Sequence, residues 1–222
     1  TRRSSDLEAI GLGFSSMLRS IVRHDPDVIM IGEIRDGETA SIALNSAVTG
    51  HLVLATLHTN DAPTAVTRLA NMGAPGYMIA SALKVVLAQR LVRRICPACR
   101  RQVGRMPQEV CDEFPDLTGA ALWAGAGCET CRQSGYSGRT AVFESFVVTE
   151  RIAEMVAGGA TTGALRSAAV AGGLVPLRRA GLALVAEGVT TLDELYRVTR
   201  DVAERRSAAD RRGGERRKDG PA

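Results

Sequence analysis

The sequence is poor in lysine and in aromatic residues, and it lacks any long apolar run. Aromatic residues make up 4% of the 222 residues, too few for a surface on which nucleic-acid bases stack. No apolar run approaches the roughly 18 residues that cross a bilayer, so the sequence predicts no membrane span. The chain opens on Thr1 without an apolar segment of signal-peptide type, so we interpret it as a fragment and expect no secretion signal.

The only lysines are Lys84 and Lys218, and neither follows a glycine. A phosphate-binding P-loop places glycine directly before lysine, so that backbone amides cradle the phosphates while the ammonium group reaches the terminal ones. We therefore expect any such loop to lie upstream of Thr1. The formal net charge is +4, and residues 200–222 hold eight basic and five acidic side chains. The rest of the chain is near neutral, which argues against direct binding of nucleic acid.

The five cysteines form two C-x-x-C pairs, Cys96 with Cys99 and Cys128 with Cys131, and leave Cys111 alone. Without a secretion signal, this pattern favours metal over disulfides and implies the cytoplasm. Each pair presents two thiolates from one tight turn, and two pairs complete a tetrahedral zinc site. Reduced free thiols and a redox role are the alternatives, and we expect Cys111 to be an idle thiol.

Residues 28–57 have the pattern of a βαβ unit. The short β-branched run 28–31 predicts a strand buried on both faces of a parallel sheet. Asp36 is a candidate N-cap for a helix that Gly50 ends, and the apolar run 52–57 predicts the second strand. The unit places the chain in the α/β class.

The remaining elements are expected from shorter signals. We expect Asp61 to cap a helix that ends at Gly73, and a helical segment to follow at 77–88. A loop-dominated insert is expected at 96–138 and a strand at 139–148. The C-terminal part should then contain a helix after Thr149, a helix closed by Gly188 and a capping box formed by Thr191 and Glu194, with disorder from about residue 201. The pattern between the helical segment and Cys96 fits either a strand or a helix end.

Two polar residues directly follow the predicted strands, Glu33 after the first and His58 after the second. The carboxyl ends of parallel strands meet at the edge of the sheet where ligands bind, so we expect both side chains to face the place of a nucleotide phosphate. Gly32 lets the backbone approach closely, while Arg35 and Thr59 offer donors to phosphate oxygens.

Each of these residues also has a structural interpretation. Taken alone, Glu33 fits a helix cap or a surface charge, and His58 fits a structural hydrogen bonder at a strand end. His51, directly after Gly50, fits a residue that closes the preceding helix. Asp27 lies at the amino end of the first strand, where a capping or turn role is expected.

The stretches "VRHDPDVIMIGEIRD" (22–36) and "TGHLVLATLHTND" (49–61) resemble the Walker B segment and the histidine box of the type II secretion and type IV pilus assembly ATPases. "LAQRLVRRICPAC", "GCETC" and "GYSGRTAVFE" resemble the stretches that follow in the assembly branch. Together these motifs are specific to the family. The retraction motors of the same superfamily resemble the first 90 residues but lack the four-cysteine module, so the cysteines favour assembly.

The resemblance implies the C-terminal part of a RecA-like P-loop NTPase domain with a zinc-binding insert and a helical C-terminal section. By matching position, Glu33 is the Walker B glutamate near magnesium and the attacking water. His58 and, less directly, His51 match the histidine box, which contacts the terminal phosphate; Gly32, Arg35 and Thr59 complete the expected nucleotide-binding set. The implied cofactors are ATP with Mg²⁺ and a structural Zn²⁺ on Cys96, Cys99, Cys128 and Cys131.

The resemblance also implies a homo-hexameric ring in the cytoplasm, held at the inner membrane through a platform and a cytoplasmic adaptor protein. The expected domains are an ATPase core at 1–95, a zinc module at 96–138, a mainly helical section at 139–200 and a basic tail at 201–222. The alternative function is a non-catalytic zinc-stabilised adaptor, which would also fit a chain without a P-loop.

Overall fold

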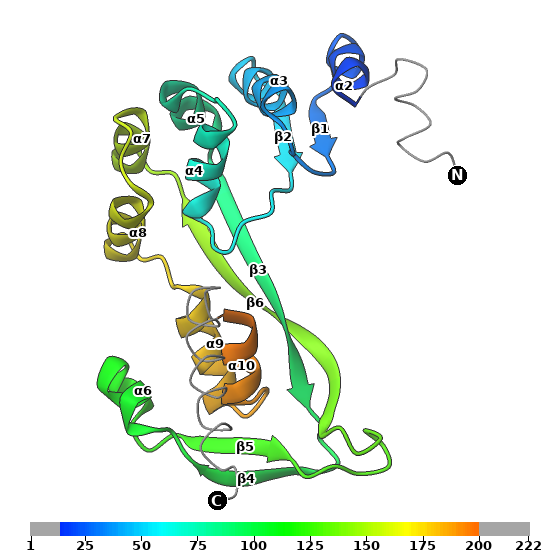
Figure 1. The fold of residues 1–222 in the computed structure, drawn as a ribbon, viewed down its shortest axis with the longest axis vertical. Helices are drawn as coiled ribbons and strands as arrows, with labels where there is room; N and C mark the ends of the chain where they lie inside the picture. The colour runs from blue at the N-terminus through cyan, green and yellow to red at the C-terminus, as the bar shows by residue number, and fades with distance from the viewer. Residues whose placement is uncertain (1–13, 200–222) are drawn as a thin grey trace, which may run out of the picture. The chain divides into compact units, whose positions relative to one another are not determined.

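The computed structural model describes residues 14–199 of the chain (Figure 1). The elements in chain order are α2 (Phe14–Val22), β1 (Val28–Ile31), α3 (Gly37–Val48), β2 (Leu52–Ala55), α4 (Thr64–Asn71), α5 (Gly76–Ala82), β3 (Val85–Ile95), β4 (Arg100–Arg105), α6 (Gln108–Glu113), η1 (Pro115–Leu117), β5 (Ala121–Gly125), β6 (Tyr136–Val147), α7 (Glu150–Ala157), α8 (Thr162–Ala171), α9 (Leu177–Ala186) and α10 (Leu192–Thr199). The disorder predicted from about residue 201 lies outside the described residues. No helix within residues 14–199 combines the length and the apolar character that a bilayer crossing requires.

Contacts along the chain divide the described residues into two units. The first contains the residues up to Ala88 together with Ser145–Leu174, and the second contains Gln89–Glu144 together with the residues from Val175 onward. Strands β3 and β6 pair with each other, and each contributes residues to both units. The four domains predicted from the sequence stay predictions.

In the first unit, β1, α3 and β2 form the predicted βαβ arrangement (Figure 1). β1 and β2 are parallel, with Val28 opposite Leu52 and Ile31 opposite Ala55. The Asp36 side chain accepts a hydrogen bond from the Thr39 amide, as expected of an N-cap. Gly50 follows the helix with φ +110°, a conformation that glycine adopts without strain.

The prediction that the first strand is buried on both faces is wrong for the described residues. Ile29 and Ile31 are buried, whereas Val28 and Met30 are 53% and 79% exposed. Leu52 and Leu54 of β2 are also exposed. A parallel sheet normally has helices on both faces, and α3 packs beside this two-stranded sheet. The two strands therefore carry more apolar side chains than the described helices cover.

The helix predicted at 77–88 is shorter than expected, because α5 ends at Ala82 and the chain enters β3 at Val85. Residues 85–95 alternate in burial along β3, as a strand does, which resolves the ambiguous segment before Cys96. The predicted caps hold elsewhere: Asp61 accepts from the Thr64 amide at 2.9 Å, although Pro63 occupies the N-cap position of α4. Thr149 caps α7 through the Ile152 amide.

The loop-dominated insert predicted at 96–138 contains more regular structure than expected. β4 and β5 pair antiparallel, from Arg100 opposite Gly125 to Arg105 opposite Ala121. Every residue of β4 is exposed, so the strand carries no alternation of polar and apolar residues that the sequence would reveal. A core packs against this pair, formed by the buried residues Met106, Val110, Cys111, Leu117, Leu182, Val185 and Leu195.

The capping box predicted at the start of α10 is half formed. The Thr191 hydroxyl accepts from the Glu194 amide at 3.1 Å, but the Glu194 carboxylate turns toward two arginines. It accepts from the backbone N–H of Arg93 at 3.0 Å and from the guanidinium groups of Arg93 and Arg197 at 2.7 and 2.6 Å. The Glu194 side chain is fully buried. Hydrogen bonds from Arg197 and from Arg93 lower its pKa from 4.5 to about 2, against the opposing effect of burial.

Because the pKa of the Glu194 carboxyl is lowered, we expect the stability of the second unit to fall in acid. Because the folded pKa lies below the unfolded one, the stabilisation is complete above about pH 4.5 and is lost as the pH falls toward 2. We expect Glu194→Gln to lower the free energy of unfolding at pH 7 by about 2 kcal/mol, since water screens the half-exposed guanidinium groups. Urea unfolding of the parent and Glu194→Gln proteins between pH 2 and 7 measures both effects, and the difference between the two proteins cancels the acid loss of any cysteine-bound metal, which they share.

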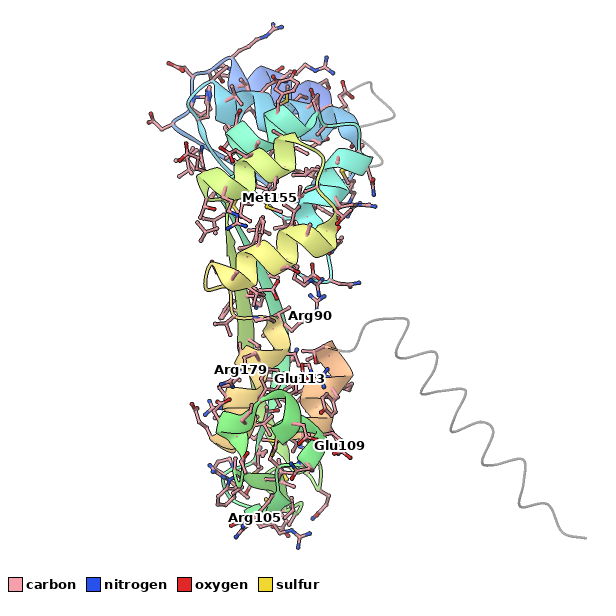
Figure 2. The ribbon with its side chains drawn as sticks, turned by 90° about the vertical axis from the view of Figure 1, so that its left-hand side faces the viewer. Arg90, Arg105, Glu109, Glu113, Met155 and Arg179 are labelled. Carbon is pink, nitrogen blue, oxygen red and sulfur yellow. The ribbon has the colours of Figure 1, made fainter. Side chains whose placement is uncertain are left out.

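The control for this measurement is Glu109→Gln, which removes an exposed carboxylate from α6 in the same unit (Figure 2). We expect it to leave the stability at pH 7 within about 0.5 kcal/mol. Equal acid dependence in the Glu194→Gln and parent proteins would show that this carboxylate does not cause the pH effect.

Candidate functional site

The first unit brings Glu33 and His58 into direct contact. Glu33 follows β1 and His58 follows β2, and because these strands are parallel neighbours their carboxyl ends lie at one edge of the sheet. His58 Nε2 lies 2.9 Å from Glu33 Oε1. The Glu33 side chain is 19% exposed and that of His58 is 87% exposed. The carboxylate is therefore held near the protein surface while the imidazole faces solvent.

Arg35 contacts the other oxygen of the same carboxylate. Its Nε donates to Glu33 Oε2 at 2.6 Å, and its side chain is 77% exposed. Glu33 is thus bridged by one imidazole and one guanidinium group, both largely exposed to solvent. A carboxylate in this position has the chemistry to orient or deprotonate a water molecule.

The backbone around this pair is fixed by hydrogen bonds between the loops that follow β1 and β2. The Ile34 amide donates to the Thr56 carbonyl at 3.0 Å, and the Thr56 hydroxyl donates to the Gly32 carbonyl. A Cβ atom added to Gly32 would have no other atom within 4 Å, so this side of the loop is open. Thr56 is a site residue that the sequence reasoning missed; its one signal is its place directly after β2.

Thr59 lies beside His58 in the same loop and is half-buried. His51, by contrast, precedes β2 and so lies at the opposite end of the strand from His58. Its Nδ1 is 3.0 Å from the Ser46 carbonyl at the end of α3, and its buried Nε2 has no hydrogen-bond partner among the described residues. Four strand residues span about 13 Å, so the structure does not bring His51 to the Glu33–His58 pair.

The second unit brings the four paired cysteines together. The sulfur atoms of Cys96, Cys99, Cys128 and Cys131 all lie within 4.8 Å of one another. Three of the sulfur pairs are 3.9, 3.8 and 3.7 Å apart. A zinc ion about 2.3 Å from each of four sulfurs separates them by about 3.8 Å, so the thiol geometry fits a tetrahedral zinc site.

Backbone amides point at one of these sulfurs. The N–H groups of Cys128 and Gly135 donate to Cys131 Sγ at 3.2 and 3.3 Å. Although burial opposes ionisation, these two bonds lower the pKa of Cys131 to about 6, while burial raises the pKa of Cys99 to about 11. Neighbouring thiolates repel one another, so the four thiols do not all ionise by themselves. A divalent cation removes this repulsion, because it deprotonates the thiols that bind it. Cys111 is buried in the apolar core of the same unit, away from the cluster.

Comparisons with known proteins agree on one family. A family model described as "Type II/IV secretion system protein" matches residues 6–197. The chain is 48% identical over 192 residues to the type II secretion system protein HxcR of Pseudomonas aeruginosa. This alignment covers 86% of the chain and 38% of HxcR. The chain is 44% identical over 190 residues to the type IV pilus assembly ATPase PilB of Myxococcus xanthus, covering 84% of the chain and 34% of that protein. The chain thus spans less than two fifths of the length of these relatives.

A solved structure of the pilus retraction motor PilT with bound ADP superposes with a TM-score of 0.60 at 23% identity. The likeness covers 86% of this chain and 45% of that one. At this identity the comparison shows the fold alone. It agrees with the α/β fold class that the sequence predicts.

Proposed function

The chain belongs to the family of type II/IV secretion system proteins, and from this membership we propose that it is part of a motor ATPase. In this proposal the whole protein couples hydrolysis of Mg·ATP to the assembly of a type II secretion pseudopilus or a type IV pilus. Two observations support it: the relatives include a type IV pilus assembly ATPase, and Glu33 and His58 meet at the carboxyl ends of two parallel strands. The second observation carries the proposal, because that edge is where α/β sheets bind nucleotides.

Within this site we propose that Glu33 positions and deprotonates the water that attacks the terminal phosphate. His58 and Arg35, which both contact Glu33, would contact phosphate oxygens, with Gly32 and Thr59 lining the same loops. Mg²⁺ would neutralise charge on the β and γ phosphates when nucleotide is bound. We leave His51 out of this set, because its imidazole bonds to the end of α3.

We propose that the four clustered cysteines hold one structural Zn²⁺ that stabilises the second unit. The thiols come from two turns, one after β3 and one after β5, so a shared ion ties these segments together. All four positions are filled by protein ligands, which is the arrangement of structural rather than catalytic zinc.

We propose further that the whole protein forms a hexameric ring at the cytoplasmic side of the inner membrane. A membrane platform and a cytoplasmic adaptor of the secretion or pilus machine would hold it there. The names of the relatives support a role in such machinery. The alternative is a non-catalytic adaptor held together by zinc, which the cysteine cluster fits equally well. The coding sequence upstream of Thr1 distinguishes the two: if it encodes no phosphate-binding loop, G-x-x-x-x-G-K-[ST], the adaptor is favoured over the motor.

Phosphate release with Mg·ATP tests this proposal. We expect the full-length protein to hydrolyse ATP and the 222-residue chain alone to show only background release, because the chain contains no Gly-Lys to build a phosphate loop. Turnover that scaled with the concentration of the chain alone and disappeared in Glu33→Gln would contradict the second expectation. A full-length protein that neither bound nor hydrolysed ATP would contradict the first.

A further inference from the structure

The second unit contains a hollow of about 300 Å³ that none of the functions above uses. Its polar lining comes from Arg94, Arg100 and Ser137, and its apolar lining from Ile95, Pro97 and Val189. No aspartate or glutamate lines it. We call this hollow the arginine pocket. With two guanidinium groups and no carboxylate in its walls, it is a place of positive potential.

Arg100 is held in a fixed position at this pocket. Its guanidinium group lies 4.1 Å from the centre of the Trp123 ring and donates to the Glu187 carbonyl at 3.0 Å. Gly188, with φ +69°, closes over this stack: a Cβ there would lie 2.4 Å from Arg100 Nη2 and 2.6 Å from the Trp123 ring. The glycine therefore permits both the turn and the close approach, and the guanidinium group is ordered before any ligand binds.

The other two polar groups of the pocket have no partner among residues 14–199. Neither Arg94 nor Ser137 forms a side-chain hydrogen bond or ion pair with a described residue, and both are exposed. Residues 89–105 contain six arginines and no acidic residue, and Glu194 neutralises Arg93 within this set. The pocket thus combines one ordered guanidinium with a second guanidinium and a hydroxyl that lack partners among the described residues.

We propose that the arginine pocket binds a carboxylate of an acidic segment of a partner protein. Two guanidinium groups match the paired oxygens of a carboxylate, and the apolar walls suit the methylene groups that carry it. Nucleic acid is disfavoured because the rings of Trp123 and of Tyr136, the residue next to Ser137, already stack on Arg100 and Arg93. The pocket uses no residue of the Glu33–His58 site, so its ligand would not compete with nucleotide for those side chains.

The probe for this proposal is an acetylated five-residue peptide with four glutamates around one leucine, and its glutamine counterpart is the matched control. Trp123 is the sole tryptophan of the chain and stacks on Arg100, so its fluorescence reports binding to the zinc-loaded chain. Calorimetry measures the same peptides on the full-length protein. We expect saturable binding of the glutamate peptide with a Kd of roughly 0.1 mM at low salt.

The expected loss in Arg94→Ala is at least tenfold in affinity, because a charge-assisted hydrogen bond contributes that much. Arg94 forms no side-chain hydrogen bond or ion pair with a described residue, so this change removes charge without breaking either. The control is Arg105→Ala, at the far end of β4 and outside the pocket, which should stay within twofold (Figure 2). Equal losses in both variants, or equal binding of the glutamine peptide, would overturn the proposal. Displacement by inorganic phosphate at lower concentrations than by acetate would overturn the choice of a carboxylate.

Discussion

Glu33→Gln in the full-length protein should leave ATP binding nearly intact and slow hydrolysis by roughly 10² to 10⁴. The substitution preserves the shape of the side chain and the contacts that its amide can make to His58 and Arg35. It removes the negative charge and the basicity that a water-activating group needs. Steady-state phosphate release gives kcat, and equilibrium titration with nucleotide gives the Kd.

His58→Ala should slow turnover less than Glu33→Gln does, because the proposed contact of this exposed imidazole with phosphate would assist the reaction without holding metal or water. Glu38→Gln is the matched control: Glu38 is a carboxylate in the first turn of α3, half-exposed and paired with Arg19, and its loss should leave kcat unchanged. The order of the effects is decisive. Parent-like turnover in Glu33→Gln together with an inactive His58→Ala would make the carboxylate a structural contact and the histidine the centre of the site.

The purified chain should carry about one tightly bound zinc ion, and the double variant Cys96→Ser, Cys128→Ser should retain less than roughly a fifth of an equivalent. The double substitution removes one ligand from each C-x-x-C turn, so neither turn keeps two thiolates. Zinc sites of this kind contribute about 10–16 kcal/mol to the folding of small domains, so we also expect the second unit to lose its protection against hydrogen exchange.

Cys111→Ala is the matched control for the zinc experiment, because Cys111 is a cysteine of the same unit that lies outside the cluster. It should keep a full equivalent of zinc while losing some stability from the apolar core. Metal analysis after mild purification under reducing conditions measures all three proteins. Unchanged zinc in the double variant, or less than a fifth of an equivalent in the parent chain, would contradict the structural zinc site.

The βαβ unit and its caps were predictable because their signals are local. A β-branched run, a capping aspartate at Asp36 and a glycine at Gly50 act within a few residues of themselves. The approach of Glu33 to His58 was predictable for a similar reason: once two strands are parallel neighbours, residues that follow each of them share one edge. The spacing of the cysteines likewise predicted a cluster that the structure forms.

Other features depend on residues distant in the chain and gave no local signal. Glu194 has the sequence context of a capping residue, but Arg93, 101 positions earlier, supplies a stronger partner than the helix amide does. The strand β4 is exposed along its whole length, so no periodicity marks it. The arginine pocket leaves no trace in the net charge, which is near neutral before the tail although residues 89–105 are strongly basic.

The central claim is that Glu33 acts on ATP bound at the carboxyl edge of β1 and β2. The most direct test is the identity of the nucleotide that full-length protein retains after mixing with Mg·ATP and rapid removal of free nucleotide. The account predicts ADP on the parent protein and unhydrolysed ATP on Glu33→Gln. ADP on both proteins would contradict the role of Glu33, and the absence of retained nucleotide on both would favour the adaptor over the motor.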